Sequence, residues 1–112
     1  LPVQGSGKGG RNTHFVLEMA DQIFFENQLE WSPSQLAHVK ILSFGTDGTD
    51  GPTEAAGAYF DMNSYKKCLK QSLNPKEFLK NFDSYSFFEK LEQLIVTGPG
   101  PTNLMDVRWI SW

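Results

Sequence analysis

The chain has 112 residues, of which 39% are hydrophobic and 13% aromatic, so it is predicted to fold around one core. Its net charge is −3, and its ten lysines and arginines are scattered among acidic residues, which argues against a nucleic-acid-binding surface. No apolar run approaches the roughly 20 residues of a membrane-spanning helix, so no membrane contact is predicted. The single cysteine, Cys68, fits a reducing compartment, so a cytoplasmic location is predicted, with the mitochondrion as the alternative.

The first half of the chain is predicted to form four segments: the end of a strand at 2–4, a glycine-rich turn at 5–10, a helix from Arg11 or Asn12 onwards, and a buried strand at 38–44. Apolar residues recur at steps of three and four through the helix, which is the pattern of an amphipathic face. Asn12 or Thr13 is predicted to cap this helix.

The second half is predicted to form a short strand at 58–61, a helix at 64–71, a helix from Pro75 with Asn74 as its cap, a helix that Asp83 or Ser86 caps, and strands at 94–97 and 107–112. Strands that alternate with helices predict an α/β fold, a layered sheet with parallel or mixed pairing and flanking helices. The chain 1–112 is predicted to be a single domain. It begins with Leu in what reads as mid-strand, so we expect it to be part of a larger polypeptide.

The loop 45–53, Gly-Thr-Asp-Gly-Thr-Asp-Gly-Pro-Thr, directly follows the predicted buried strand. Its glycines allow close backbone approach, and its carboxylates, Asp47 and Asp50, lie where α/β proteins bind ligands. Either carboxylate could bind Mg²⁺ or orient a hydroxyl in phosphoryl transfer. Alternatively, each Asp could bond its own backbone in a turn or cap a helix that begins near Thr53.

Gly5-Ser-Gly-Lys-Gly-Gly10 matches Gly-x-Gly-x-x-Gly, but it lacks the second-strand acidic residue of a dinucleotide site and the Ser or Thr of a P-loop. By itself it is a flexible turn. Arg11 follows it, and a guanidinium at a helix N-terminus suits a carboxylate or a phosphate. The alternative for Arg11 is a surface salt bridge. Thr102-Asn103 and Asp106 could supply a further polar edge at a strand end. The alternative is that these residues only form a turn.

Several stretches of the chain share one pattern with a known domain, in the same order and at similar spacing: 9–12, 45–58, 83–88, 94–99 and 102–106. Together they resemble the motifs of the MOFRL domain, the C-terminal domain of type 2 glycerate kinases. The chain departs from the family's pattern at Thr13-His14, where the family has Gln-Glu, at Phe82, which replaces a polar residue, and at Pro101, which removes a backbone donor.

The resemblance implies that the chain is the C-terminal domain of an enzyme that transfers the γ-phosphoryl group of ATP to D-glycerate with Mg²⁺. In that family the N-terminal domain is Rossmann-like and the active site lies between the domains. This chain would therefore supply one wall of the cleft, would be inactive by itself, and could take part in a homodimer.

With the resemblance, Arg11, Asp47 and Asp50 are the catalytic candidates, and Asp47 or Asp50 is the candidate metal ligand. The residues expected to bind substrate or phosphate are Gly9, Gly10, Asn12, Thr46, Gly48, Thr49, Thr102 and Asn103. Two other function classes stay open. One is an oxidoreductase of the hydroxypyruvate reductase type, and the other is a non-catalytic module that binds a partner protein or joins two subunits.

Overall fold

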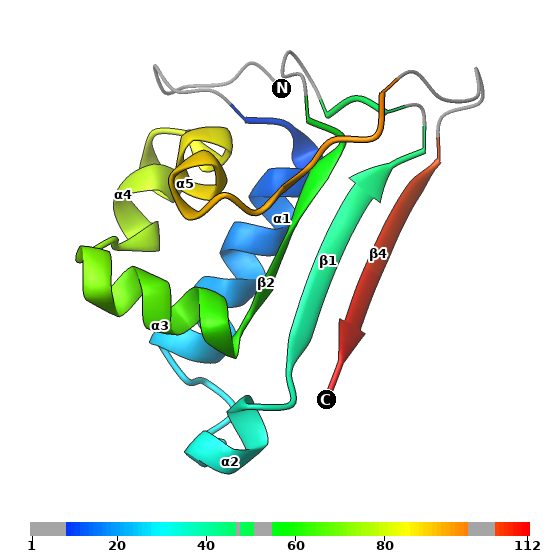
Figure 1. The fold of residues 1–112 in the computed structure, drawn as a ribbon. Helices are drawn as coiled ribbons and strands as arrows, with labels where there is room; N and C mark the ends of the chain where they lie inside the picture. Colours follow the sequence, from blue (N-terminus) through cyan, green and yellow to red (C-terminus); the bar gives the residue numbers. More distant parts are fainter. Residues whose placement is uncertain (1–8, 47, 51–54, 99–104) are drawn as a thin grey trace.

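The computed structural model describes residues 9–46, 48–50, 55–98 and 105–112, which form a sheet with helices gathered on one side of it (Figure 1). In chain order the elements are α1 (Arg11–Ala20), the π-helix η1 (Asp21–Phe25), α2 (Pro33–Leu36), β1 (Lys40–Gly45), β2 (Gly57–Asp61), α3 (Met62–Gln71), α4 (Pro75–Lys80), α5 (Ser84–Leu91), β3 (Leu94–Ile95) and β4 (Asp106–Ser111). In the described ranges no helix is long and apolar enough to cross a bilayer.

The sheet has the strand order β3-β2-β1-β4, and every pair of neighbours in it is antiparallel. The predicted layered α/β architecture with flanking helices is confirmed, but the expected parallel pairing is wrong for these strands. A parallel neighbour needs a crossover connection, usually a helix. No helix begins near Thr53 in the part that the structure describes, and Ala55-Ala56 leads directly into β2. The chain therefore turns back beside β1.

The core lies between the sheet and the helices. From α1 it takes Val16, Leu17 and Ala20, and from the helix-facing side of the sheet it takes Ile41 and Phe60, all of which are buried. Since side chains alternate across a strand, burial at Ile41 and Phe60 places their sequence neighbours on the opposite face. The buried residues of α1 lie on the side that the amphipathic pattern of the first predicted helix indicated.

The helix boundaries follow local capping chemistry in most places. Asn74 precedes Pro75 at the start of α4, and its side chain accepts a bond from the Lys76 backbone N–H at 3.0 Å, as predicted. The expected cap of α1 is wrong, because the N-cap residue is Gly10 and both Asn12 and Thr13 lie in the first helical turn. The group that satisfies this helix end comes from elsewhere in the chain.

Candidate functional site

The N-terminus of α1 is capped by a carboxylate from the loop that follows β1. Asp50 accepts a hydrogen bond from the Asn12 backbone N–H at 2.7 Å on Oδ1 and one from the Thr13 backbone N–H at 2.8 Å on Oδ2. Asp50 is fully buried. The first N–H groups of a helix have no partner within it and carry the positive end of its dipole, so a carboxylate there is strongly favoured. The protein's own Asp50 thus fills the anion position of this helix.

The two glycines before α1 are explained by packing around that contact. A Cβ on Gly10 would lie 2.3 Å from the backbone oxygen of Asp50 and 2.4 Å from its Cγ, and a Cβ on Gly9 would lie 2.4 Å from Oγ of Ser84. Side chains cannot approach so closely, so glycine at both positions lets the loop with Asp50 and the start of α5 reach the helix end. Their predicted role in phosphate binding stays a prediction.

Asn12 connects α1 to two strands through its side chain, which is fully buried. Its Oδ1 accepts a bond from the Ser43 hydroxyl in β1 at 2.5 Å, and its Nδ2 donates to Oδ1 of Asp106 at the start of β4 at 3.0 Å. A buried amide with both ends paired fixes the relative position of the three elements. Asn12 therefore positions the surrounding groups, whatever it also contacts in a complex.

Arg11 lies at the accessible rim of this cluster. Its Nε donates to Oδ2 of Asp106 at 2.5 Å, and its side chain is 44% exposed. The surface salt bridge that the sequence left open as an alternative is thus present, and the partner is the carboxylate that Asn12 also holds. The bond from Arg11 is the main cause that lowers the pKa of Asp106, helped by the bond from Asn12 and opposed by partial burial.

This carboxylate gives the chain an acid-sensitive contribution to stability. Because the folded-state pKa of Asp106 lies below its ordinary value of 3.8, the stabilisation is complete above that pH and is lost as the pH falls through the folded pKa. We expect the urea midpoint to fall more steeply below about pH 4 in wild type than in Asp106→Asn. Urea titrations of both proteins from neutral to acid pH measure this, and parallel curves would contradict it.

Two described residues of the predicted loop, Thr46 and Gly48, lie beside the same strand ends. The Thr46 backbone N–H donates to the Met105 carbonyl at 2.8 Å, and the Met105 N–H donates to the Thr46 hydroxyl at 3.0 Å, so the loop is tied to the residue before β4. Gly48 has φ +84°, and a Cβ there would lie 1.8 Å from the Gly98 carbonyl oxygen. Thr49 is exposed. Three further predicted residues lie outside the described residues: Asp47, Thr102 and Asn103.

The structure thus brings Arg11, Asn12, Gly10 and Asp50 into one cluster, with Thr46 and Gly48 next to it along the sheet edge. Sequence reasoning did not select the buried hydroxyls that support it, and it treated Asp106 only as a polar edge. These hydroxyls belong to Ser43, Thr13 and Ser84, the last two 2.7 Å apart. A serine within an apolar buried strand was the available signal for Ser43.

The described residues do not by themselves fit a divalent cation. They contain no group of three or more His, Cys, Asp or Glu side chains that could hold a metal ion. Both oxygens of Asp50 accept backbone N–H bonds, and both oxygens of Asp106 accept bonds from Arg11 and Asn12. Oxygen ligands for Mg²⁺ need accessible lone pairs, and at these two carboxylates they are directed towards donors of the chain itself.

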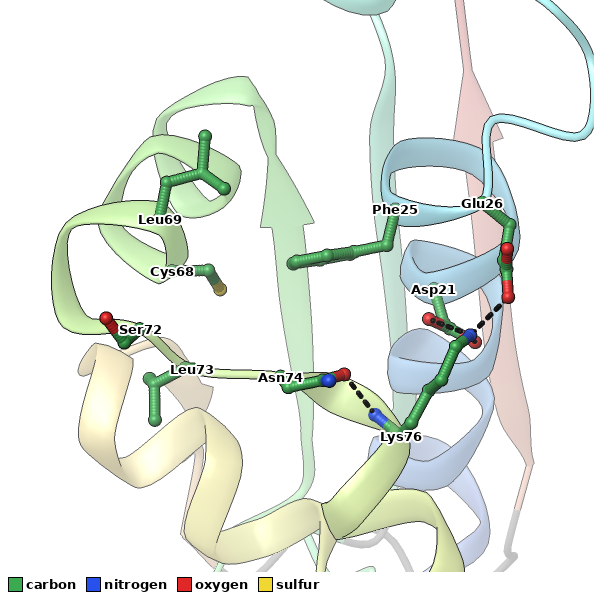
Figure 2. Close-up of a pocket in the computed structure, with 9 residues that line it drawn as sticks. All are labelled: Asp21, Phe25, Glu26, Cys68, Leu69, Ser72, Leu73, Asn74 and Lys76. Carbon is green, nitrogen blue, oxygen red and sulfur yellow. Dashed lines mark hydrogen bonds and ion pairs between the residues drawn. The ribbon is translucent and has the colours of Figure 1, made fainter.

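A separate pocket of about 330 Å³ lies between η1 and the α3–α4 connection (Figure 2). Lys76 reaches into it and pairs with Glu26 and, at 3.0 Å, with Asp21. The bond to Glu26 is the main cause that raises the pKa of Lys76, and the bond to Asp21 adds to it. Burial raises the pKa of the Cys68 thiol to about 12, so this thiol is protonated and unreactive at neutral pH. The charges of this pocket pair with one another, and we assign no chemistry to it.

Comparison with known proteins shows which proteins the chain is similar to. Residues 1–106 match the domain family described as MOFRL family. D-glycerate 2-kinase of Thermotoga maritima is 40% identical over 105 residues, which cover 94% of this chain and 23% of that protein. A putative hydroxypyruvate reductase of Agrobacterium vitis is 34% identical over 110 residues, which cover 98% of this chain and 26% of that protein.

The fold also matches a solved structure. The crystal structure of glycerate kinase from Thermotoga maritima superposes with a TM-score of 0.74 and 34% sequence identity, over 99% of this chain and 25% of that one. The chain therefore spans about a quarter of the length of the relatives that it matches.

Proposed function

Because the chain belongs to the MOFRL family, we propose that it is the C-terminal domain of a glycerate kinase and forms one wall of the cleft in which ATP phosphorylates D-glycerate. Relatives named as glycerate kinases support this proposal, since the matches to them extend over 94–99% of this chain. The single observation that carries it is the Arg11 guanidinium, which lies at the first position of α1, is 44% exposed and is held by Asp106.

Arg11 is the group that neutralises charge on glycerate or on the transferring phosphoryl group. Phosphoryl transfer depends mainly on placement and on electrostatic stabilisation of spread negative charge, and a guanidinium fixed before substrate arrives supplies both. Asp106 acts through Arg11 as a positioning residue. The predicted substrate contacts of Thr46, Gly48 and Thr49 belong to the same edge of the sheet. We keep Asp47 as a catalytic candidate, and Thr102 and Asn103 as candidate substrate contacts, from the sequence motifs alone.

Asp50 receives a different role from the one its sequence motif first suggests. Its carboxylate is buried and bonded to two backbone N–H groups, so we propose that it holds the N-terminus of α1, and Arg11 with it, in place. We assign the binding of ATP and Mg²⁺ mainly to the larger, Rossmann-like part of the same polypeptide. When bound there, the metal would help to neutralise charge on the phosphate groups.

The name of the Agrobacterium vitis relative, putative hydroxypyruvate reductase, favours a second candidate function, reduction of hydroxypyruvate with a nicotinamide cofactor. The two reactions have different readouts, ADP release and nicotinamide absorbance. Both can be measured on one preparation of the full-length polypeptide with D-glycerate, L-glycerate and hydroxypyruvate.

In the full-length polypeptide we expect ADP release specific to D-glycerate, and we expect Arg11→Ala to lower kcat/KM by roughly 100-fold or more, the scale for losing one electrostatic donor. Arg108→Ala is the matched control, since this variant also loses a guanidinium, but one that lies on β4 over the Phe15 ring. Arg11→Lys keeps the charge without the planar donor set, so its kcat/KM is expected to lie between those of wild type and Arg11→Ala.

Each alternative result has a definite meaning. ADP release that survives Arg11→Ala would keep the kinase and reduce Arg11 to a structural salt bridge. A hydroxypyruvate-dependent nicotinamide signal without ADP release would favour the oxidoreductase. Neither signal from any substrate would leave the non-catalytic module as the function.

A further inference from the structure

The strand register divides the sheet into two unlike faces. The row Phe60–Ile41–Ile110 crosses β2, β1 and β4 on the side of the helices, where Ile41 and Phe60 are buried. Arg108 belongs to the same side, because its guanidinium lies 4.5 Å from the centroid of the Phe15 ring in α1. Residues between these positions along each strand must therefore point to the other side of the sheet.

That other side, the outer face, carries an apolar patch made of the cross-strand row Tyr59–Leu42–Trp109 and the neighbouring pair Phe44–Val107. The next row on the same face, Asp61–Lys40–Ser111, is polar. Tyr59 is 39% exposed and Trp109 is 57% exposed. An antiparallel sheet with one solvated face normally carries polar residues there, so five adjacent apolar side chains indicate a covered surface.

None of the described helices covers the outer face. Figure 1 shows α1, α3, α4 and α5 gathered on one side of the sheet, and the helix-facing residues of β1 and β2 are those in the core. The largest exposed side chain of the outer face is an indole, the type most enriched at the centres of protein interfaces. What covers this face must come from outside the described residues.

We propose that the outer face docks against an apolar surface of the larger domain of the same polypeptide. This inference rests on the part of the proposed function that makes the chain one domain of a longer protein. The relatives are about four times as long as this chain, so most of each relative lies outside the matched region. A covalently attached domain is present at high effective concentration, which favours it over a separate copy of the chain.

Hydroxyl-radical footprinting of the wild-type full-length polypeptide tests the proposal without any variant. Oxidation of Trp109 and Tyr59 is measured by mass spectrometry in the native protein and in urea, and each native rate is divided by its unfolded rate. Leu69 in α3 is the matched internal control, because it is 59% exposed and lies on the helix side of the sheet. An exposure of 57% would lower the Trp109 rate only about twofold, whereas an interface core would lower it about tenfold or more.

Tenfold protection of Trp109 that persists on dilution to a monomeric sample supports docking of the larger domain. Protection that disappears on dilution would assign the face to a second copy and overturn the proposal. A Trp109 ratio equal to that of Leu69 would mean that the face is open, and would also overturn it. Since no outcome depends on turnover, a failed kinase assay and an uncovered outer face are separate results.

Discussion

Replacing Asp50 by alanine is expected to lower the free energy of unfolding by roughly 2–5 kcal/mol, because it leaves two buried backbone N–H groups without acceptors. Those groups belong to Asn12 and Thr13, and the bonds lost are 2.7 and 2.8 Å long. The loss exceeds that of an ordinary helix cap, about 1 kcal/mol, because Asp50 is fully buried and water cannot replace the carboxylate. Urea unfolding of the chain, followed by circular dichroism at neutral pH, measures the difference.

Asp106→Ala is the matched control for this variant. It removes a second carboxylate from the same helix end, but one that is partly exposed and paired with the half-exposed Arg11. The surface ion pair contributes about 0–1 kcal/mol, and the one buried donor that the variant leaves unpaired, Nδ2 of Asn12, costs about 1–3 kcal/mol. The control is therefore expected to lower the free energy of unfolding by less than Asp50→Ala, which leaves two such donors. Equal losses from the two variants would mean that the buried cap is not the main contribution of Asp50. Asp50→Asn should lie between them, since an amide accepts one bond but directs its own donors at the second N–H.

The second large effect is expected at Gly48. Gly48→Ala should lower the free energy of unfolding by about 2–5 kcal/mol, because the new Cβ adds backbone strain and an overpacking clash. The strain follows from φ +84°, and the clash is with the Gly98 carbonyl oxygen, 1.8 Å from the position of that Cβ. Since both partners of the clash are backbone, neither can rotate away. The loop 45–50 and the chain after β3 would have to separate.

Gly98→Ala isolates the strain from the clash. Gly98 also has a positive φ, +75°, but a Cβ on it would meet no atom within 4 Å. We therefore expect Gly98→Ala to lower the free energy of unfolding by only about 1 kcal/mol, the strain of an alanine in the left-handed conformation. Differential scanning calorimetry of the two variants beside wild type would show the contrast as a larger fall in Tm for Gly48→Ala. Similar Tm values for both would contradict the close approach of the two loops.

Sequence alone was sufficient for features that depend on neighbours in the chain. The Asn74-Pro75 start of α4 was predicted correctly, because a cap needs only the residues within one turn. The core-facing side of α1 was also predicted, since the period of apolar residues fixes it. These are local effects, and their signals are local.

Features that depend on distant residues were less accessible. The expected parallel pairing was wrong, because strand direction depends on whether a helix intervenes after the loop 45–53, and that loop's glycines and aspartates suit a hairpin as well as a crossover. Asp50 was selected as important, but its partners lie 37 and 38 residues away in α1, and no spacing rule identifies them. Arg11 was expected to meet an anion, and in this structure that anion is Asp106.

The Asp50 cap has a consequence for the order in which the chain folds. Closing a loop of this length costs entropy before any contact repays it, so the first turn of α1 is stabilised only after β1 has delivered Asp50 to it. The amide protons of Asn12 and Thr13 are then expected to exchange with solvent only when the whole domain opens, although they belong to a helix terminus, where fraying is the rule. A partly folded chain therefore has helices but no formed cluster around Arg11, and the cluster appears together with the complete tertiary structure.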